Sequence, residues 1–308
     1  MAHLLSDLVH YFKLDETNID NWTFKLFYKA SSVICMLGAT VGIATQYFGD
    51  PISCEFQGIN SDLAQDYCWI HGTSYIPPQY QPHMKCIVEL EGIESVDDAP
   101  DTAYYQWVTF IMAIHAGVFY APYYIWSVLE NGLIASFGTD GKTTVMIAEE
   151  QKYDDGVVIE AVVERYTKYF KSIFHHNNWY FGYFIFCEFL NFFLMIIQFW
   201  LIDAFLNNKF RWFGLEVVEY YSWSFRDRQN RDLMLRNPLC SVFPTEVSCN
   251  IPNVGAAGNE QAHNGLCVLT QNIINEKIYL FLWFWFMFLF CVSIFFVFYR
   301  LVYNHNIF

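Results

Sequence analysis

The chain has 308 residues, of which 55% are apolar, 20% aromatic and only 16% charged. This composition is too apolar for an ordinary soluble globular protein, and the aromatic content excludes disorder. The net charge of −14 disfavours nucleic acid as a partner, because phosphate binding draws on clustered Lys and Arg. A membrane protein or a very large buried core remains.

Four apolar stretches are each long enough to cross ~30 Å of hydrocarbon. They are residues 30–48, 104–126, 179–206 and 278–303. The first is rich in small and polar residues, which suits a helix packed on neighbours, whereas the fourth has no charge before Arg300. In the second, Pro122 removes a backbone donor and is expected to kink the helix. The sequence therefore predicts an all-α membrane protein built on a bundle of four transmembrane helices.

The spans divide the rest of the chain into an N-terminal segment (1–29), a first loop (49–103), a middle loop (127–178), a second loop (207–277) and a short tail (304–308). Four passes place both termini on one side of the membrane. No cleavable signal peptide is visible in residues 1–13, so the first span is expected to act as its own insertion signal. In the middle loop, residues from Gly156 onward are predicted to be helical, with Glu164 and Lys168 as a favourable pair. After the second span, Asn131 and Gly132 predict a helix end.

The nine cysteines are unevenly distributed, and none lies in the termini or the middle loop. Three fall inside spans and six in the two long loops: Cys54, Cys68, Cys86, Cys240, Cys249 and Cys267. Because disulfides persist only in oxidising space, this segregation predicts extracellular long loops and cytoplasmic termini. Six free or metal-bound thiols are the alternative, which the lack of zinc-like spacing disfavours. We expect no metal or cofactor, and no catalytic motif indicates an enzyme.

Five blocks of sequence resemble the innexins, the invertebrate gap-junction proteins, in the family's order. They are YYQWV (Tyr104, Tyr105, Gln106, Trp107 and Val108), YFGDPISC (47–54), DYCWIHGT (66–73), FPTEVSC (243–249) and CVLTQNIINEKIYLFLWFWF (267–286). The resemblance implies a plasma-membrane gap-junction protein that assembles, alone or with other innexin subunits, into a ring-shaped large-pore channel of about eight subunits. Such a hemichannel docks to one on an adjacent cell and passes ions and small metabolites.

The resemblance also implies how the loop cysteines pair, in reversed order between the loops: Cys54 with Cys267, and Cys68 with Cys249. Family members usually have two cysteines per long loop, whereas this chain has three. Extending the same nested series predicts a third bridge between Cys86 and Cys240. Two free thiols, or pairing between subunits, are the alternatives. Most members also continue well beyond the fourth span, whereas five residues follow Tyr303 in this sequence.

The N-terminal segment has an apolar stripe at helical spacing and a polar stripe opposite, formed by His3, Ser6, Asp7, His10 and Lys13. By the resemblance, this helix folds into the cytoplasmic mouth of the pore, which makes the polar stripe the pore-lining candidates. A helix lying on the inner leaflet is the alternative, which the few cationic residues disfavour.

Three further interpretations follow from single motifs. The aromatic residues of YYQWV are expected to form an interfacial belt rather than to line the pore directly. Glu188, inside the third span, is expected to face the bundle and to pair, with Asn191 one turn on as a candidate partner. The sequon at Asn21 is expected to be cytoplasmic and unmodified.

Two other functions share this topology. An undocked, pannexin-like large-pore channel cannot be separated from a docking channel by sequence. A pore-less four-pass adhesion or scaffold protein would have the same spans and paired loops, but the polar, small-residue first span argues against it.

Overall fold

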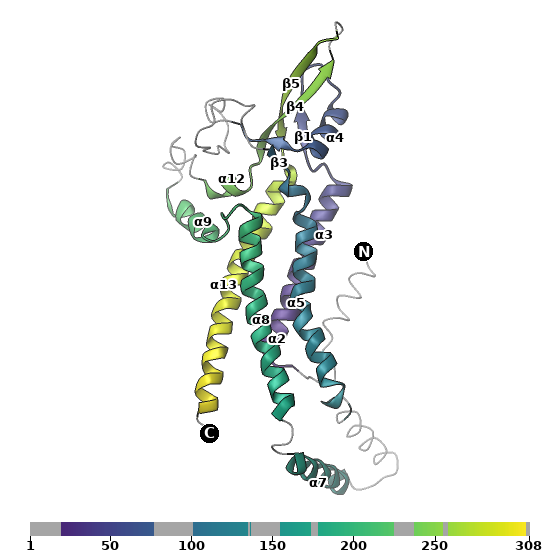
Figure 1. The fold of residues 1–308 in the computed structure, drawn as a ribbon, viewed down its shortest axis with the longest axis vertical. Helices are drawn as coiled ribbons and strands as arrows, with labels where there is room; N and C mark the ends of the chain where they lie inside the picture. The colour runs from purple at the N-terminus through teal and green to yellow at the C-terminus, as the bar shows by residue number, and fades with distance from the viewer. Residues whose placement is uncertain are drawn as a thin grey trace. The chain divides into compact units, whose positions relative to one another are not determined.

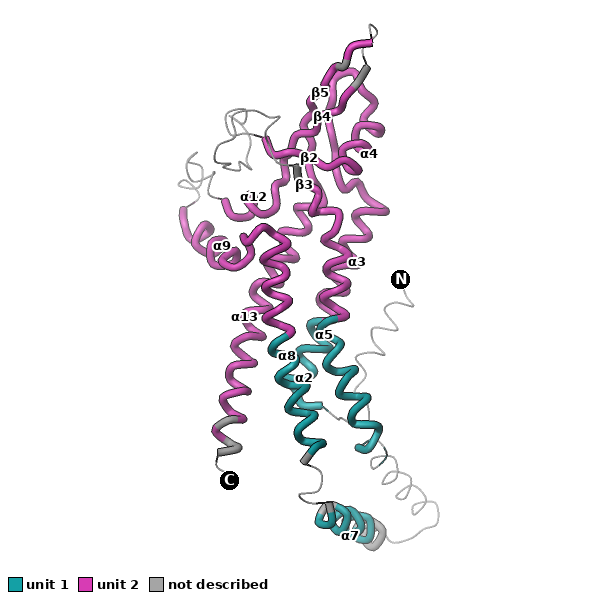
Figure 2. Tube along the Cα trace, in the orientation of Figure 1, with its two compact units in different colours: residues 1–31, 118–193 teal, residues 32–117, 194–308 magenta. Residues whose placement is uncertain are grey.

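The computed structural model of the protein describes residues 20–76, 101–134, 136, 155–173, 178–224, 237–254 and 258–305. These residues are mostly helical and belong to two compact units, coloured separately in Figure 2. Unit 1 comprises residues 1–31 and 118–193, and unit 2 comprises residues 32–117 and 194–308.

Four helices among the described residues are long and apolar enough to cross a membrane: Trp22–Phe48, Val108–Glu130, Trp179–Phe205 and Thr270–Arg300. The first is made of α2 (Trp22–Lys25), a π-helical stretch η1 (Leu26–Ser31) and α3 (Ser32–Phe48). The others lie in α5 (Val108–Glu130), α8 (Asn178–Phe205) and α13 (Thr270–His305), shown in Figure 1. The predicted four-helix membrane fold is confirmed.

Two of these helices begin earlier than hydropathy indicated, because their first turns are polar. The first helix starts at Trp22 rather than near residue 30, where Asn21 Oδ1 accepts hydrogen bonds from Phe24 N (2.7 Å) and Thr23 Oγ1 (2.8 Å) as an N-cap. Asn21 Nδ2 also donates to Glu188, so this carboxylate is paired within unit 1. The fourth helix starts at Thr270 rather than near residue 278.

The end of α5 and the helix in the middle loop were both indicated by the sequence. Helix α5 ends at Glu130, followed by Asn131 and Gly132 at φ 54° and 74°, as predicted. Pro122 lies inside α5, and the helix continues through it. In the middle loop, α7 (Asp155–Ile173) is the predicted helix, with Glu164 and Lys168 paired at 2.8 Å, and it ends before α8 begins.

The described residues of the loops form a five-stranded antiparallel sheet, which is an addition to the predicted all-helical fold. Its strands are β1 (Ser53–Glu55), β2 (Thr73–Ser74), β3 (Asp101–Thr102), β4 (Glu246–Val254) and β5 (Glu260–Val268), in the order β1-β5-β4-β2-β3. Both long loops contribute strands. The helices α4 (Ser61–His71), α9 (Phe213–Ser222) and α12 (Pro238–Val242) belong to the same loops.

Each unit has its own apolar core. In unit 1, Phe24, Tyr28, Trp126 and Cys187 are buried together, and the rings of Tyr28 and Tyr123 stack with centroids 4.0 Å apart. In unit 2, the core is formed by Ile52, Cys54, Cys68, Tyr105, Val247, Cys249, Cys267 and Leu269. The second core lies within the sheet and its helices, and both long loops contribute to it.

Helix α9 is held against α13 by a close backbone approach. An added Cβ at Gly214 would lie 2.1 Å from Cε3 of Trp283, a distance at which either the Trp283 ring or one of the two helices must shift. The indole Nε1 of Trp283 also donates to the Arg211 carbonyl oxygen at 3.2 Å. Glycine is therefore required at position 214 by packing.

We predict that Gly214→Ala destabilises the folded protein by about 1–3 kcal/mol, because the methyl group overpacks the Trp283 ring. The matched control is Gly182→Ala in α8, where nothing lies within 4 Å of the added Cβ. The control is expected to be neutral or stabilising by up to about 1 kcal/mol, since alanine favours helix. Thermal unfolding in lipid nanodiscs measures both, and equal midpoints for the two variants would contradict the close packing.

Candidate functional site: a cap joined to the spans by disulfides and buried amides

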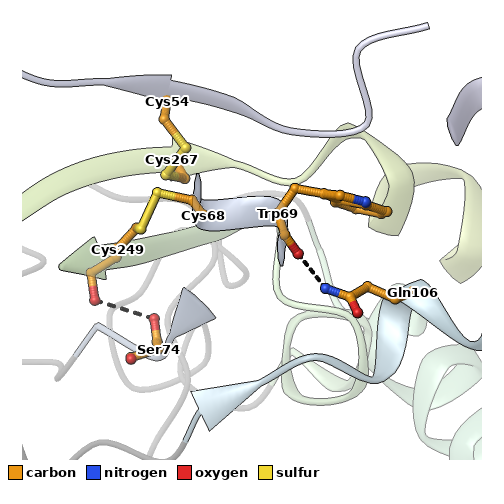
Figure 3. Close-up of a disulfide and its surroundings, with 8 residues drawn as sticks. Cys54, Cys68, Trp69, Ser74, Gln106, Cys249 and Cys267 are labelled. Atoms are coloured by element: carbon orange, nitrogen blue, oxygen red, sulfur yellow. Dashed lines mark hydrogen bonds between the residues drawn. A yellow bond between two sulfur atoms is a disulfide. The ribbon is translucent and has the colours of Figure 1, made fainter. Parts of the chain in front are cut away.

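The described residues of the two long loops form one structure, here called the cap (residues 49–76, 101–107, 207–224, 237–254 and 258–269). Two disulfides join its two loops (Figure 3). Cys54 on β1 and Cys267 on β5 are register partners with Cα atoms 4.0 Å apart, and Cys68 on α4 bonds to Cys249 on β4 with Cα atoms 5.9 Å apart. These are the pairings that the innexin resemblance implied.

The sulfur atoms of Cys54, Cys68 and Cys267 lie within 4.8 Å of one another, a grouping that could suggest a metal site. All three are consumed in disulfides and offer no thiolate, which is the form that binds metal. The cluster is therefore structural, and its disulfides hold the two long loops together. Cys240 is buried in α12, whereas its predicted partner Cys86 lies outside the described residues, so the third bridge stays a prediction.

The YYQWV motif joins the start of α5 to both loops. Its first three residues form a short 3-10 helix, η3 (Tyr104–Gln106). The Tyr104 hydroxyl donates to the Val242 carbonyl (2.8 Å) and accepts from Asn272 Nδ2 (3.1 Å), while Gln106 Nε2 donates to the Trp69 carbonyl. Tyr105 is fully buried beside the disulfides. The interpretation of this motif as an interfacial belt is wrong for Tyr105 and fits only Trp107, which is 60% exposed.

Burial governs the chemistry of Tyr104. Loss of solvation raises the pKa of its hydroxyl well above the ordinary value, and the neighbouring Tyr75, Tyr279 and Tyr105 act in the same direction. The hydrogen bond from Asn272 opposes this only in part. Tyr104 is therefore a neutral hydrogen-bonding group at any physiological pH.

Three side-chain amides at the start of α13 form a buried network that ties the cap to the spans. Gln271, Asn272 and Asn275 are all 0% exposed. Gln271 Nε2 donates to Asn275 Oδ1 (3.2 Å), and Asn275 Nδ2 donates to Asn272 Oδ1 (3.3 Å).

The network bonds to four residues of unit 2 outside α13. Thr45 on α3 donates to Gln271 Oε1, and the Gln271 backbone N–H donates to the Pro51 carbonyl at 3.1 Å. Asn272 Nδ2 donates to the Pro244 carbonyl at 2.8 Å as well as to Tyr104. Buried amides cost free energy unless paired, so these bonds set where the cap meets α3 and α13.

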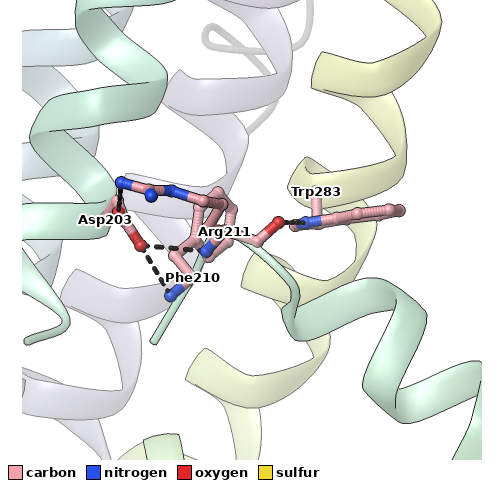
Figure 4. Close-up of polar contacts among 4 residues, drawn as sticks. All are labelled: Asp203, Phe210, Arg211 and Trp283. Atoms are coloured by element: carbon pink, nitrogen blue, oxygen red, sulfur yellow. Dashed lines mark hydrogen bonds and ion pairs between the residues drawn. The ribbon is translucent and has the colours of Figure 1, made fainter. Parts of the chain in front are cut away.

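A buried carboxylate shapes the chain where α8 enters the second loop (Figure 4). Asp203 is 1% exposed, and its Oδ1 accepts from the backbone N–H groups of Phe210 (3.0 Å) and Arg211 (2.9 Å). Its Oδ2 accepts from Arg211 Nη2 at 3.1 Å. Nearby, Lys209 Nζ donates to the Ser241 carbonyl (2.9 Å), and burial lowers the pKa of this amine.

Sequence reasoning located the disulfides and the motif but missed the amides and Asp203. A usable signal existed for the amides, because positions 271, 272 and 275 share one face of a helix. The predicted pore-lining residues lie outside the described residues: His3, Ser6, Asp7, His10 and Lys13.

Comparison with known proteins identifies the family. The Innexin family model matches residues 20–306. The chain is 34% identical to "Innexin inx2" of Schistocerca americana over 273 residues, covering 87% of this chain and 72% of that protein. It is also 34% identical to "Innexin inx3" of Drosophila melanogaster over 294 residues, covering 94% of this chain and 70% of that protein.

The chain belongs to the innexin family. This innexin is a gap-junction channel subunit, a multi-pass membrane protein that assembles with other innexin subunits. Innexins are channel proteins, which fits the absence of any catalytic motif in the sequence.

We predict that Tyr104→Phe destabilises the cap by about 1–3 kcal/mol, because it leaves the buried Val242 carbonyl without its donor. The control is Tyr47→Phe, which removes a hydroxyl from a side chain that is 72% exposed and is expected to change stability by less than about 0.5 kcal/mol. Thermal unfolding in nanodiscs measures both variants.

The pH dependence provides a second readout for Tyr104. A raised pKa in the folded state means that only the unfolded chain ionises above the ordinary value of about 10. Stability should therefore be level below pH ~10 and fall above it, and Tyr104→Phe should make that fall shallower. An unchanged slope would argue against a buried, neutral Tyr104.

Proposed function

We propose that this innexin docks to the hemichannel of an adjacent cell through the cap, and in particular through the free part of the β4–β5 hairpin. The observation that supports this is the extent of the sheet. Among the described residues, strand β1 pairs only with residues 266–268 of β5, and β2 pairs with β4 only at Ser248. Residues 249–254 and 260–265 thus form a two-stranded ribbon that extends beyond the rest of the sheet, away from α3 and α13 (Figure 1).

The chemistry of the ribbon suits reversible association. Its outer backbone edges face no third strand in the described sheet, and such edges readily pair with another chain. Two of its cross-strand pairs are polar and uncharged, Asn250 with Asn264 and Asn253 with Gln261, and the side chains of Asn250 and Asn264 are exposed. Amide side chains offer donors and acceptors without the desolvation cost of charges.

The disulfides support an extracellular cap. All four cysteines of the two bridges lie in the cap, whereas the free Cys35, Cys187 and Cys291 lie in the spans. Because structural disulfides persist in oxidising space, the cap faces the outside and both termini face the cytoplasm. The bridge from Cys86 to Cys240 is a further part of this proposal.

In the proposed channel, about eight subunits form the ring. The N-terminal segment folds into its cytoplasmic mouth, and His3, Ser6, Asp7, His10 and Lys13 line the path. An undocked, pannexin-like channel would share the pore but not the docking step.

We predict that Pro252→Thr, which completes an N-x-T sequon at Asn250 on the ribbon, blocks docking but not hemichannel activity. If the cap is extracellular, Asn250 receives a glycan, and its bulk keeps opposing ribbons apart. Glycosidase treatment should shift the protein on a gel. Dye transfer between paired expressing cells should be lost, while dye uptake by single cells persists.

The matched control is Pro252→Ala, which makes the same loss of proline without a sequon and should retain dye transfer. An unglycosylated Pro252→Thr protein at the cell surface would contradict the orientation. A fully glycosylated protein with normal dye transfer would place docking elsewhere. Dye uptake without transfer in the unmodified protein would favour the undocked channel.

We predict that Asp7→Lys lowers the cation-to-anion permeability ratio, because each subunit exchanges a negative for a positive charge at the mouth of the pore. The control is Asp15→Lys, in the same segment but outside the five residues of the polar stripe. Reversal potentials in asymmetric salt measure the ratio. An unchanged ratio for Asp7→Lys in normally assembled channels would place this residue off the path.

A further inference from the structure

We propose that helix α9 lies in the surface of the bilayer on the cap side, with Leu215 and Val218 among the acyl chains of zwitterionic phospholipids. This helix connects the end of α8 to the rest of the second loop, and neither the channel path nor docking accounts for its composition.

Helix α9 has two sets of apolar residues, one buried and one exposed. One face is buried against the protein: Phe213, Gly214, Val217 and Tyr220. A second set of apolar side chains is about half exposed or more: Trp212 (61%), Leu215 (52%), Val218 (53%) and Tyr221 (52%). A helix that already packs one apolar face on its protein and exposes another is matched to a second apolar environment.

The acidic residues of α9 are Glu216 and Glu219. At about 100° per residue, Leu215 and Tyr221 lie about 60° to either side of Val218. Glu219 lies about 100° from Val218, and Glu216 about 160°. On the same scale Trp212 lies about 120° from Val218, so Glu219 lies at the edge of the exposed apolar surface, between Leu215 and Trp212. Only Glu216 points away from Val218. An apolar surface bordered by acids is the arrangement of a helix lying between hydrocarbon and water.

The attachment to α13 sets the depth of α9. Arg300, the first charged residue after Lys277 on that helix, is 17 positions beyond Trp283. At 1.5 Å per residue this is about 26 Å along the helix, close to the ~30 Å of the hydrocarbon core. With Arg300 at one boundary, Trp283 lies near the other. The contacts of Trp283 with Arg211 and Gly214 thus hold the start of α9 at the bilayer surface.

The residues around α9 indicate that phospholipid covers its exposed apolar side chains. On α13, Phe281 (53% exposed) and Phe284 (45%) flank Trp283 and present aromatic rings at the same depth. The side chain of Arg211 is 57% exposed at the start of α9, where a guanidinium can reach phosphate groups. Glu216 and Glu219 would repel anionic headgroups, so a zwitterionic phospholipid fits best. Figure 1 shows α9 beside α13 at the cap ends of the spans.

Site-specific photocrosslinking of the full chain in phosphatidylcholine nanodiscs tests this placement. Val218 is replaced by a short aliphatic diazirine amino acid, with Phe288 on α13 as the membrane reference and the exposed Glu216, on the opposite side of α9, as the water-facing control. We expect intact-mass spectrometry to show one added phosphatidylcholine at positions 218 and 288, and none above background at 216.

Each other outcome overturns the proposal. A covalent subunit dimer from position 218 would assign this face to a neighbouring copy of the chain. Lipid adducts at 288 but not at 218 would place α9 in water. Leu215, on the same face, is a second labelling position in case the first variant fails to assemble, and each variant must elute at the oligomer size of the unmodified channel.

Discussion

The rest of unit 2 depends on the requirement that the amides at the start of α13 remain paired. Gln271, Asn272 and Asn275 have no access to water, and each amide left unpaired would cost about 1–3 kcal/mol. Their partners come from α3, from the Pro51 and Pro244 carbonyls and from Tyr104. A shift of the cap relative to α13 would break several of these bonds together. The cap and the cap-side ends of α3 and α13 are therefore expected to move as one body.

The disulfides act on a different quantity, the entropy of the unfolded chain. Cys54 and Cys267 are separated by 213 residues, so closing this loop is worth about 5 kcal/mol in the chain-entropy model. Because the second bridge is nested inside the first, it closes only the short stretches between paired cysteines and contributes about 4 kcal/mol. The disulfides thus favour the correct pairing of the two loops, while the amides and the YYQWV motif determine where that paired structure sits on the helices.

Much of this fold could be predicted from sequence, and the failures have physical causes. Hydropathy located four spans but missed the first turns that follow the N-cap Asn21 and that contain the buried Gln271, because amide side chains are typical of loops. The sheet was not predicted, since β1 to β3 are too short to show alternation and the longer strands carry residues such as Asn250 and Pro252 that disfavour strands. The disulfide pairing came from family resemblance, because connectivity cannot be deduced from spacing. Tyr105 was misassigned because an aromatic residue at a span boundary suits either a lipid surface or a core.

The turn at Asp203 links how deeply the subunit sits in the bilayer to how far the cap extends from the bilayer surface. Its carboxylate is buried, yet two backbone N–H groups and Arg211 compensate the charge, so the turn from α8 towards α9 is sharply specified. On the proposal that α9 lies at the bilayer surface, the contact between Gly214 and Trp283 then fixes how far each subunit sits in the membrane. Docking across an extracellular gap requires every ribbon of a ring to end at the same height. A surface helix rigidly joined to both α8 and α13 would meet that requirement, because any subunit displaced along the membrane normal would expose Leu215 and Val218 to water or bury Glu216 and Glu219 in hydrocarbon.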